Sequence, residues 1–252
     1  MRRLELGRVV GIPISVDAGW LIVLSLVTWT LATRYFPGQI ASLTPAAYWG
    51  IGLAAAVLLF LCVLLHELGH SLVARLAGIP VSRITLFIFG GVAHIASESR
   101  RPLVELSVAL AGPVVSAGLG GLCRWGAGLI SPQTPPALAG VAILRYLAVV
   151  NMAILVFNLL PGFPLDGGRV LRAVLWAVMG DLRKATRIAS ALGSALGLGL
   201  IVLGAYAIFR GGALNGLWYV LLGWFLRDAA HASYQDVLLR QFPPQRVGGP
   251  AA

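Results

Sequence analysis

Residues 46–70 read AAYWGIGLAAAVLLFLCVLLHELGH, so an apolar run from Ala46 to Leu65 leads directly into two histidines and a glutamate. A membrane-spanning helix needs about 20 predominantly apolar residues. This stretch therefore predicts a helix that crosses a lipid bilayer and carries polar groups at one end. A charged side chain at membrane depth costs about 2.5–3.5 kcal/mol even on a lenient insertion scale, so residues kept there are candidates for a functional site.

The composition of the whole chain agrees with a membrane protein. Of its 252 residues, 58% are apolar and 11% are charged, and the mean hydropathy is +0.88. Soluble domains carry about 25% charged residues. We therefore expect an all-α polytopic membrane protein with about six transmembrane helices. The predicted spans are residues 18–35, 47–74, 104–127, 138–160, 189–209 and 213–228.

The net charge of +10 is explained by membrane topology. If the N-terminus is cytosolic, 15 of the 19 basic residues fall on the cytosolic side of the alternating spans. Such an excess in cytosolic loops orients membrane proteins, so we expect both termini in the cytosol. Nucleic acid is not an expected partner, because no basic run is interleaved with aromatic residues. The excess of arginine over lysine indicates a GC-rich genome and hence a prokaryotic cell membrane.

Residues 81–97 are rich in Val, Ile and Phe but too polar to be a span. We expect two short strands around Gly90 and Gly91, forming a β-hairpin. Open sheet edges are not tolerated against lipid, so this small β-element should lie at the membrane interface or inside the protein. Residues 4–16 have a similar composition and are also not a span.

Two regions are expected along the chain. Residues 1–228 should form one membrane domain that contains the six spans. Residues 229–252 should form a cytosolic tail, which begins amphipathic and becomes rich in Pro and Gly, a composition typical of disordered ends.

The HELGH segment predicts two of the ligands of a metal site. On a helix, His66 and His70 lie one turn apart on the same face, about 6 Å along the axis. Glu67 points about 100° away from His66, so it can reach a water on the metal without being a ligand. This arrangement is typical of zinc peptidases, in which the glutamate is the general base. A catalytic zinc takes three protein ligands, so a third must come from elsewhere in the chain.

Asp166 is the best candidate for the third ligand. It lies in FNLLPGFPLDGGRVL, residues 157–171, between two prolines and two glycines at the end of an uncharged run. Proline breaks a helix and glycine lets the backbone turn, so a helix that opens here can direct the carboxylate inward. Taken alone, Asp166 is better explained as the N-cap of a helix from Gly167 to Met179.

Together, these segments resemble the site-2 protease family of intramembrane zinc metalloproteases. The resemblance rests on HELGH at 66–70 and NLLPGFPLDGG at 158–168, and more weakly on FGGVAHI at 89–95 and LAGPVVSAG at 110–118. It implies one zinc ion held by His66, His70 and Asp166, with Glu67 as the base, and no other cofactor. It also implies that Asn158 hydrogen-bonds the scissile carbonyl or the developing oxyanion, although Asn158 could instead bond the broken helix backbone. The CBS and PDZ domains of two branches of the family are not recognisable in these 252 residues.

We therefore expect a zinc-dependent intramembrane endopeptidase that cleaves a transmembrane segment of a membrane-protein substrate, as in regulated intramembrane proteolysis. Its partners would be that substrate and membrane lipid, and the sequence does not predict an oligomeric state. One alternative is a membrane metal transporter that uses the same His and Asp ligands and does not need Glu67. A second is a non-catalytic membrane adaptor, which Glu67 and the complete ligand set argue against.

A helical substrate must unwind before its carbonyls can reach a metal, because a transmembrane helix bonds every backbone group internally. The predicted hairpin could receive the unwound segment as an added strand. We expect residues Ile84 to Phe89 to offer outward N–H groups for this pairing, with Asn158 as a second anchor.

Overall fold

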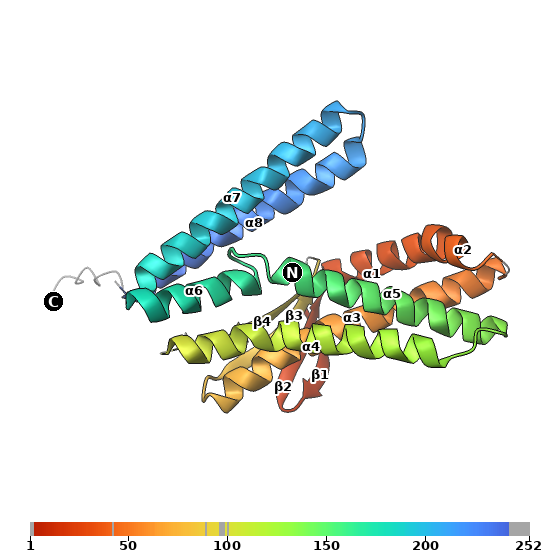
Figure 1. Ribbon diagram of the computed structural model, residues 1–252, viewed down its shortest axis with the longest axis horizontal. Helices are drawn as coiled ribbons and strands as arrows, with labels where there is room; N and C mark the ends of the chain where they lie inside the picture. The colour runs from red at the N-terminus through yellow and green to blue at the C-terminus, as the bar shows by residue number, and fades with distance from the viewer. Residues whose placement is uncertain (1–2, 42, 89, 96–98, 100, 242–252) are drawn as a thin grey trace, which may run out of the picture. The chain divides into compact units, whose positions relative to one another are not determined.

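The computed structural model describes residues 3–41, 43–88, 90–95, 99 and 101–241 (Figure 1). Its internal contacts divide the chain into two compact units. The first unit comprises residues 1–100 and 107–157, and the second comprises residues 101–106 and 158–252. The chain therefore passes between the units near residues 100 and 157 and also inside one helix, between residues 106 and 107.

The first unit contains a four-stranded sheet in the order β1-β2-β3-β4. Its strands are β1 (Arg3–Val9), β2 (Ile12–Asp17), β3 (Val81–Phe87) and β4 (Gly90–Ile95). Strands β1 and β2 pair antiparallel, β2 and β3 pair parallel, and β3 and β4 pair antiparallel. The predicted hairpin is confirmed over residues 81–95, whereas residues 96 and 97 lie outside the described residues. Its extension by a second, N-terminal hairpin was not predicted.

The sheet order corrects one expectation about the hairpin. Strand β3 is central, because residues 84–86 pair with residues 14–16 of β2 on one side and with residues 91–93 of β4 on the other. The expectation that residues 84–89 offer outward N–H groups is therefore wrong for residues 84–86, and Phe89 lies outside the described residues. The edge of the sheet on this side belongs to β4.

Five helices and one π-helical turn complete the first unit. A π-helical turn, η1 (Leu31–Tyr35), joins α1 (Ala18–Thr30) to α2 (Phe36–Gln39). Helix α3 (Pro45–Leu76) is 32 residues long, and the Thr44 side chain caps it by accepting the Ala47 N–H. Pro45 suits its first position because the first N–H groups of a helix have no partner within it. Helix α5 spans Pro135–Asn158 and α4 spans Pro102–Leu129, the first residues of which belong to the second unit.

Helix α3 packs on the sheet through Leu68, in the middle of the HELGH segment. Leu68 forms a buried cluster with Ile12 of β2 and Ile84 of β3. Burying large aliphatic side chains stabilises such a contact by about 1.5–3 kcal/mol each. The cluster fixes the rotation of α3 about its axis, and with it the directions in which His66, Glu67 and His70 point.

The second unit contains α6 (Asp166–Met179), α7 (Leu182–Phe209) and α8 (Ala213–Gln241). Helix α6 ends at Gly180, whose φ of 68° is left-handed and suits glycine. Helices α7 and α8 lie side by side as a hairpin (Figure 1). A Cβ added at Gly197 would lie 2.6 Å from the carbonyl oxygen of Gly223, so small residues bring the two backbones together.

Five of the described helical segments are long and apolar enough to cross a membrane. They are residues 18–39, 45–76, 102–129, 135–158 and 182–209, which correspond to five of the six predicted spans. The sixth predicted span, residues 213–228, is the first part of α8. The uncharged run there is only 16 residues, slightly below the roughly 17–25 residues of most spans.

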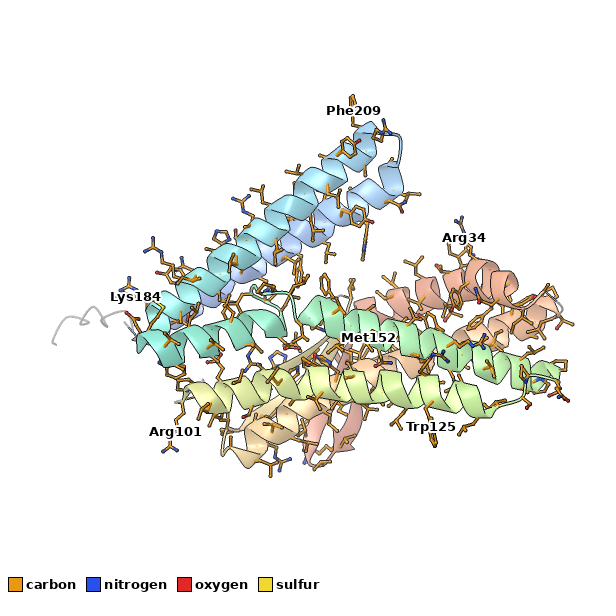
Figure 2. All side chains as sticks on the ribbon, viewed as in Figure 1. Arg34, Arg101, Trp125, Met152, Lys184 and Phe209 are labelled. Atoms are coloured by element: carbon orange, nitrogen blue, oxygen red, sulfur yellow. The ribbon has the colours of Figure 1, made fainter. Side chains whose placement is uncertain are left out.

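Large apolar side chains project outward from these helices. Figure 2 shows Trp125 on α4, Met152 on α5 and Phe209 on α7, which are 67%, 45% and 89% exposed. Exposed apolar side chains of this size on one helix after another suit a surface that faces lipid rather than water.

Helix α8 continues to Gln241, so it crosses the predicted boundary at residue 228. Residues 229–241 are helical, and residues 242–252 lie outside the described residues. The division into a membrane domain of residues 1–228 and a tail of residues 229–252 stays a prediction.

Candidate metal centre and active site

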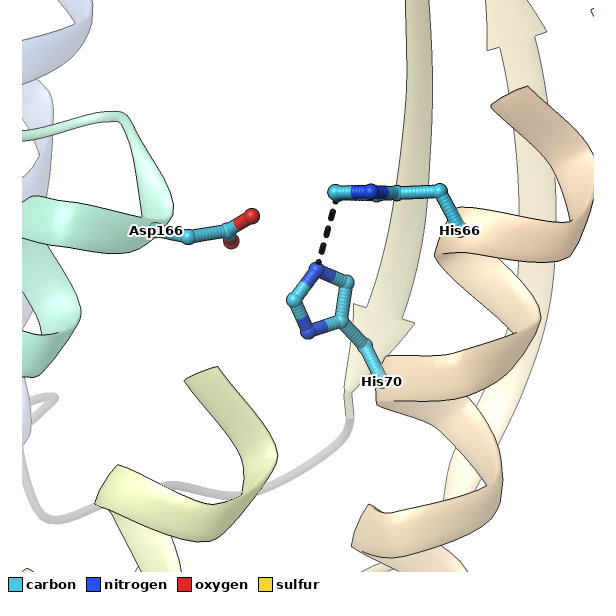
Figure 3. A group of neighbouring side chains, drawn as sticks. All are labelled: His66, His70 and Asp166. Carbon is cyan, nitrogen blue, oxygen red and sulfur yellow. Dashed lines mark hydrogen bonds between the residues drawn. The ribbon is translucent and has the colours of Figure 1, made fainter. Parts of the chain in front are cut away.

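His66 and His70 lie on α3 and turn their rings toward each other, as their spacing predicts. Both side chains are buried, each residue being 4% exposed. Their Nε2 atoms are 3.2 Å apart, and the ring centroids are 4.9 Å apart. The two imidazoles therefore present one nitrogen each to the same point (Figure 3).

The other nitrogen of each ring is held by helix α4. His70 Nδ1 donates a hydrogen bond to the Val108 carbonyl oxygen at 2.7 Å, and His66 Nδ1 lies 2.8 Å from the Ser116 hydroxyl oxygen. Because a carbonyl can only accept, the His70 proton lies on Nδ1, which leaves the Nε2 lone pair for a metal when the ring is neutral. Outer hydrogen bonds of this kind orient the histidine ligands of metal sites.

Gly112 leaves open the space beside these nitrogens. A Cβ at this position would lie 2.1 Å from His70 Nε2 and 2.6 Å from His66 Nε2. The sequence analysis gave Gly112 and Ser116 no role in the metal site. In the structure, Ser116 contacts His66 and Gly112 leaves space beside both Nε2 atoms. The LAGPVVSAG segment around them was the only signal for these roles in the sequence.

The Glu67 carboxylate lies against the sheet. Its Oε2 accepts the backbone N–H of Ala93 in β4 at 3.2 Å. A Cβ at Gly91 would lie 2.4 Å from Glu67 Cγ, so the backbone of the edge strand passes directly beside this carboxylate. The predicted base is therefore oriented by a strand that sequence reasoning did not connect with it. His94, in the same strand, has its Nε2 3.2 Å from the Thr85 hydroxyl oxygen, a contact typical of a structural role.

Asp166 is the first residue of α6 in the second unit. The N-cap of this helix is Leu165, and no side-chain capping bond is made there, so the alternative explanation of Asp166 as the N-cap is wrong. The glycines that follow it pack against the preceding loop. A Cβ at Gly167 would lie 2.3 Å from the Leu159 carbonyl oxygen, and one at Gly168 would lie 2.3 Å from the Gly162 carbonyl carbon. The sequence DGG therefore lets α6 begin directly against residues 159–162.

Asn158 is the last residue of α5 and is partly buried. It stands at the point where the helix opens, as the prolines after it predict. Its role toward a substrate stays a prediction.

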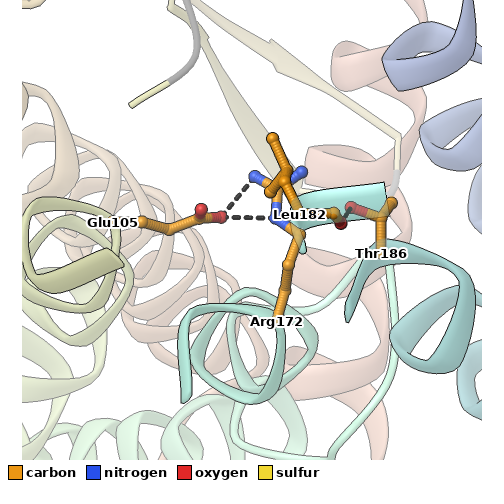
Figure 4. Close-up of polar contacts among 4 residues, drawn as sticks. All are labelled: Glu105, Arg172, Leu182 and Thr186. Carbon is orange, nitrogen blue, oxygen red and sulfur yellow. Dashed lines mark hydrogen bonds and ion pairs between the residues drawn. The ribbon is translucent and has the colours of Figure 1, made fainter. Parts of the chain in front are cut away.

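A buried ion pair in the second unit joins the start of α4 to α6 (Figure 4). Arg172 donates to Glu105 Oε1 from Nε at 2.6 Å and also from Nη2, and the Glu105 residue is 1% exposed. The Arg172 guanidinium carbon lies 5.0 Å from the centre of the Phe163 ring. The sequence analysis did not identify this pair. The partners are 67 residues apart, and no local pattern connects them.

Three described residues could together hold a metal ion, namely His66, His70 and Asp166. Figure 3 shows the elements from which they come, with the histidines on α3 and the aspartate at the start of α6. They are the three residues that the sequence analysis gives as candidate ligands. The donor set of two imidazoles and one carboxylate is one that zinc accepts in catalytic sites.

The model of peptidase family M50 matches residues 54–133 and 130–200. The matched residues include both histidines, Glu67, Asn158 and Asp166. The chain belongs to peptidase family M50. Its resemblance to the site-2 proteases is thereby confirmed, and its apolar helices identify it as an integral membrane protein.

Individual relatives agree with this assignment. The chain is 39% identical over 240 residues to a protein of Synechocystis sp. named as a candidate zinc metalloprotease, and the match covers 94% of this chain and 61% of the relative. It is 39% identical over 238 residues to Rip3 of Mycobacterium tuberculosis, described in the same terms, with 94% and 60% covered. The chain thus spans about three fifths of the length of these relatives.

A solved structure is also similar over its whole length. The site-2 protease from Methanocaldococcus jannaschii matches with a TM-score of 0.62 and 26% identity, and the match covers 100% of this chain and 99% of that chain.

Replacing Gly112 by alanine should displace the histidine nitrogens and weaken zinc binding by roughly 10–100-fold, the usual loss when the surroundings of metal ligands are disturbed. The measurement is zinc bound per purified protein during competition with a chelator. Gly118→Ala is the matched control on the same helix, because a Cβ there meets nothing within 4 Å. Equal zinc retention by both variants would show that Gly112 does not shape the site.

Removing the Glu105 carboxylate should destabilise the protein strongly, because Arg172 would stay buried without its partner. Glu105→Leu should cost about 3–5 kcal/mol of unfolding free energy. The double variant Glu105→Leu, Arg172→Leu should recover much of this loss, since it buries no charge. Thermal unfolding of all variants in one detergent measures the effect, and a double variant less stable than the single one would contradict it.

Proposed function

We propose that the chain is a zinc-dependent intramembrane endopeptidase that hydrolyses a peptide bond in a transmembrane segment of a protein substrate. The observation that carries this proposal is the buried histidine pair, whose Nε2 atoms meet in the space left by Gly112 with a glutamate next to them on the same helix. The relatives named as zinc metalloproteases support it.

We assign His66, His70 and Asp166 as the protein ligands of one zinc ion. Three protein ligands leave one coordination position for water or substrate, as catalytic zinc sites require. Zinc bound there supplies Lewis-acid polarisation of a carbonyl and lowers the pKa of water to about 7. The histidines serve as neutral ligands, and the bonds from Nδ1 to Val108 and Ser116 keep their rings in place.

Glu67 acts as the general base in this proposal. Its carboxylate takes the proton of the attacking water and returns it to the leaving amine, a role worth about 10²–10⁴-fold in rate. The Ala93 N–H donates a hydrogen bond to this carboxylate and holds it against strand β4. Asn158, where α5 ends, supplies an amide that hydrogen-bonds the developing oxyanion.

The edge strand β4 is the proposed receiver of the unwound substrate. An unwound segment leaves backbone N–H and C=O groups that are costly in lipid unless they find partners. A sheet edge offers such partners by strand addition. Strand β4 forms an edge of the sheet and passes beside Glu67, so a segment paired there would run close to the base.

Glu67→Gln should abolish proteolysis and keep zinc, because the amide cannot accept a proton while all three proposed ligands remain. Asp166→Ala should lose both zinc and activity. Zinc content by elemental analysis and cleavage of a membrane-protein substrate in vesicles measure the two properties separately. Wild-type cleavage by Glu67→Gln would exclude Glu67 as the base, and zinc transport into vesicles by that variant would favour a metal transporter.

Proline at the β4 edge should slow cleavage without releasing zinc, because it removes the backbone N–H that holds Glu67 and that an added strand would need. The variant is Ala93→Pro, and we expect a loss of at least about tenfold, equivalent to one or more hydrogen bonds to the base or to substrate. The control is Leu6→Pro in β1, an exposed residue on the opposite edge of the same sheet. Proline is tolerated on edge strands, so both variants should fold. Equal cleavage by the two variants would refute strand addition at β4.

A further inference from the structure

A cavity of about 420 Å³ lies between α7 and α8, within the second unit. Several polar and charged side chains line it beside apolar ones. Helix α7 contributes Arg187, Ser190 and Ser194, and α8 contributes Arg227, His231 and Tyr234. None of these residues belongs to the proposed zinc ligands or to the proposed base.

Two positive charges, those of Arg187 and Arg227, border the cavity. Arg187 and Arg227 form no ion pair with any acidic group in the part of the chain that the structure describes. His231 Nδ1 donates to the Arg227 carbonyl oxygen at 2.7 Å, which holds the imidazole at the same cavity. The lining therefore contains cationic and hydrogen-bonding groups that could bind an anion.

Ser190 adds a buried hydroxyl group to the lining of the cavity. The residue is 7% exposed, lines the cavity, and its hydroxyl has no hydrogen-bond partner. A buried hydroxyl without a partner costs free energy, so native proteins rarely keep one. Arginines that reach the membrane surface would explain Arg187 and Arg227. The same explanation does not account for the buried Ser190 hydroxyl, which has no hydrogen-bond partner.

We propose that this cavity binds a phosphate group, either from the headgroup of an anionic lipid or from free phosphate. The two guanidinium groups offer charge-assisted donors, and the Ser190 hydroxyl offers a further donor from inside the cavity. Basic pockets between membrane helices bind anionic headgroups in this way. Leu198 and Ala195 line the same cavity, so apolar surface adjoins the polar groups, as a lipid with an acyl chain requires.

The test uses the purified full chain and two probes. In the first arm, native mass spectrometry counts the molecules of phosphatidylglycerol and phosphatidylcholine that the protein retains. In the second arm, inorganic phosphate is titrated against thermal unfolding in an uncharged detergent. The test variant is Arg187→Gln with Arg227→Gln. The matched control, Arg183→Gln with Arg210→Gln, removes the same charge from positions that do not line the cavity.

Wild type and control should retain phosphatidylglycerol in preference to phosphatidylcholine, and the test variant should lose roughly tenfold or more of that retention. Ser194→Leu, which fills the cavity and keeps both arginines, should lose it as well, and this variant also covers the case in which the double variant fails to fold. Stabilisation by inorganic phosphate with no lipid preference would identify free phosphate as the source. The proposal is overturned if wild type shows neither response, or if all variants respond like wild type.

Discussion

The structure depends on placing two imidazoles inside a membrane protein with their Nε2 atoms 3.2 Å apart. Buried polar rings are tolerated only when their nitrogens have partners. Helix α4 meets this requirement through one backbone carbonyl and one hydroxyl, and through a glycine that lets it approach closely. The histidines therefore contribute hydrogen bonds to the packing of α4 against α3.

In the second unit, the buried polar groups that need partners are fully charged. Glu105 and Arg172 are both buried, and each would be expensive without the other. Arg172 lies on α6, which begins with Asp166, and the loop before that helix contributes the Phe163 ring against the guanidinium group. A buried ion pair is weak evidence for stability but can specify one arrangement among several similar ones. Here it specifies how α6 docks within its unit.

The sequence predicted the parts of the site that depend on local spacing. The histidines are four residues apart, and prolines and glycines surround Asp166, so helix geometry and backbone chemistry were sufficient to select them. The hairpin at β3 and β4 followed from its composition in the same way. Contacts between distant segments could not be predicted, because Ser116 lies 50 residues from His66 and Val108 lies 38 residues from His70. The parallel pairing of β2 with β3, which makes β4 the edge, is also a long-range contact and changed the interpretation of the hairpin.

Under the proposed function, the hydrogen bond from Ala93 to Glu67 would have a consequence for substrate selection. The N–H that would pair with an incoming strand at this point is the one that the base already holds. A bound strand would compete with Glu67 for that donor, so arrival of an extended backbone and release of the carboxylate would be one event. A peptide that stays helical or coiled would leave the carboxylate engaged. Reactivity would then be gated by the conformation of the substrate more than by its side chains, which spares intact helices in the same membrane.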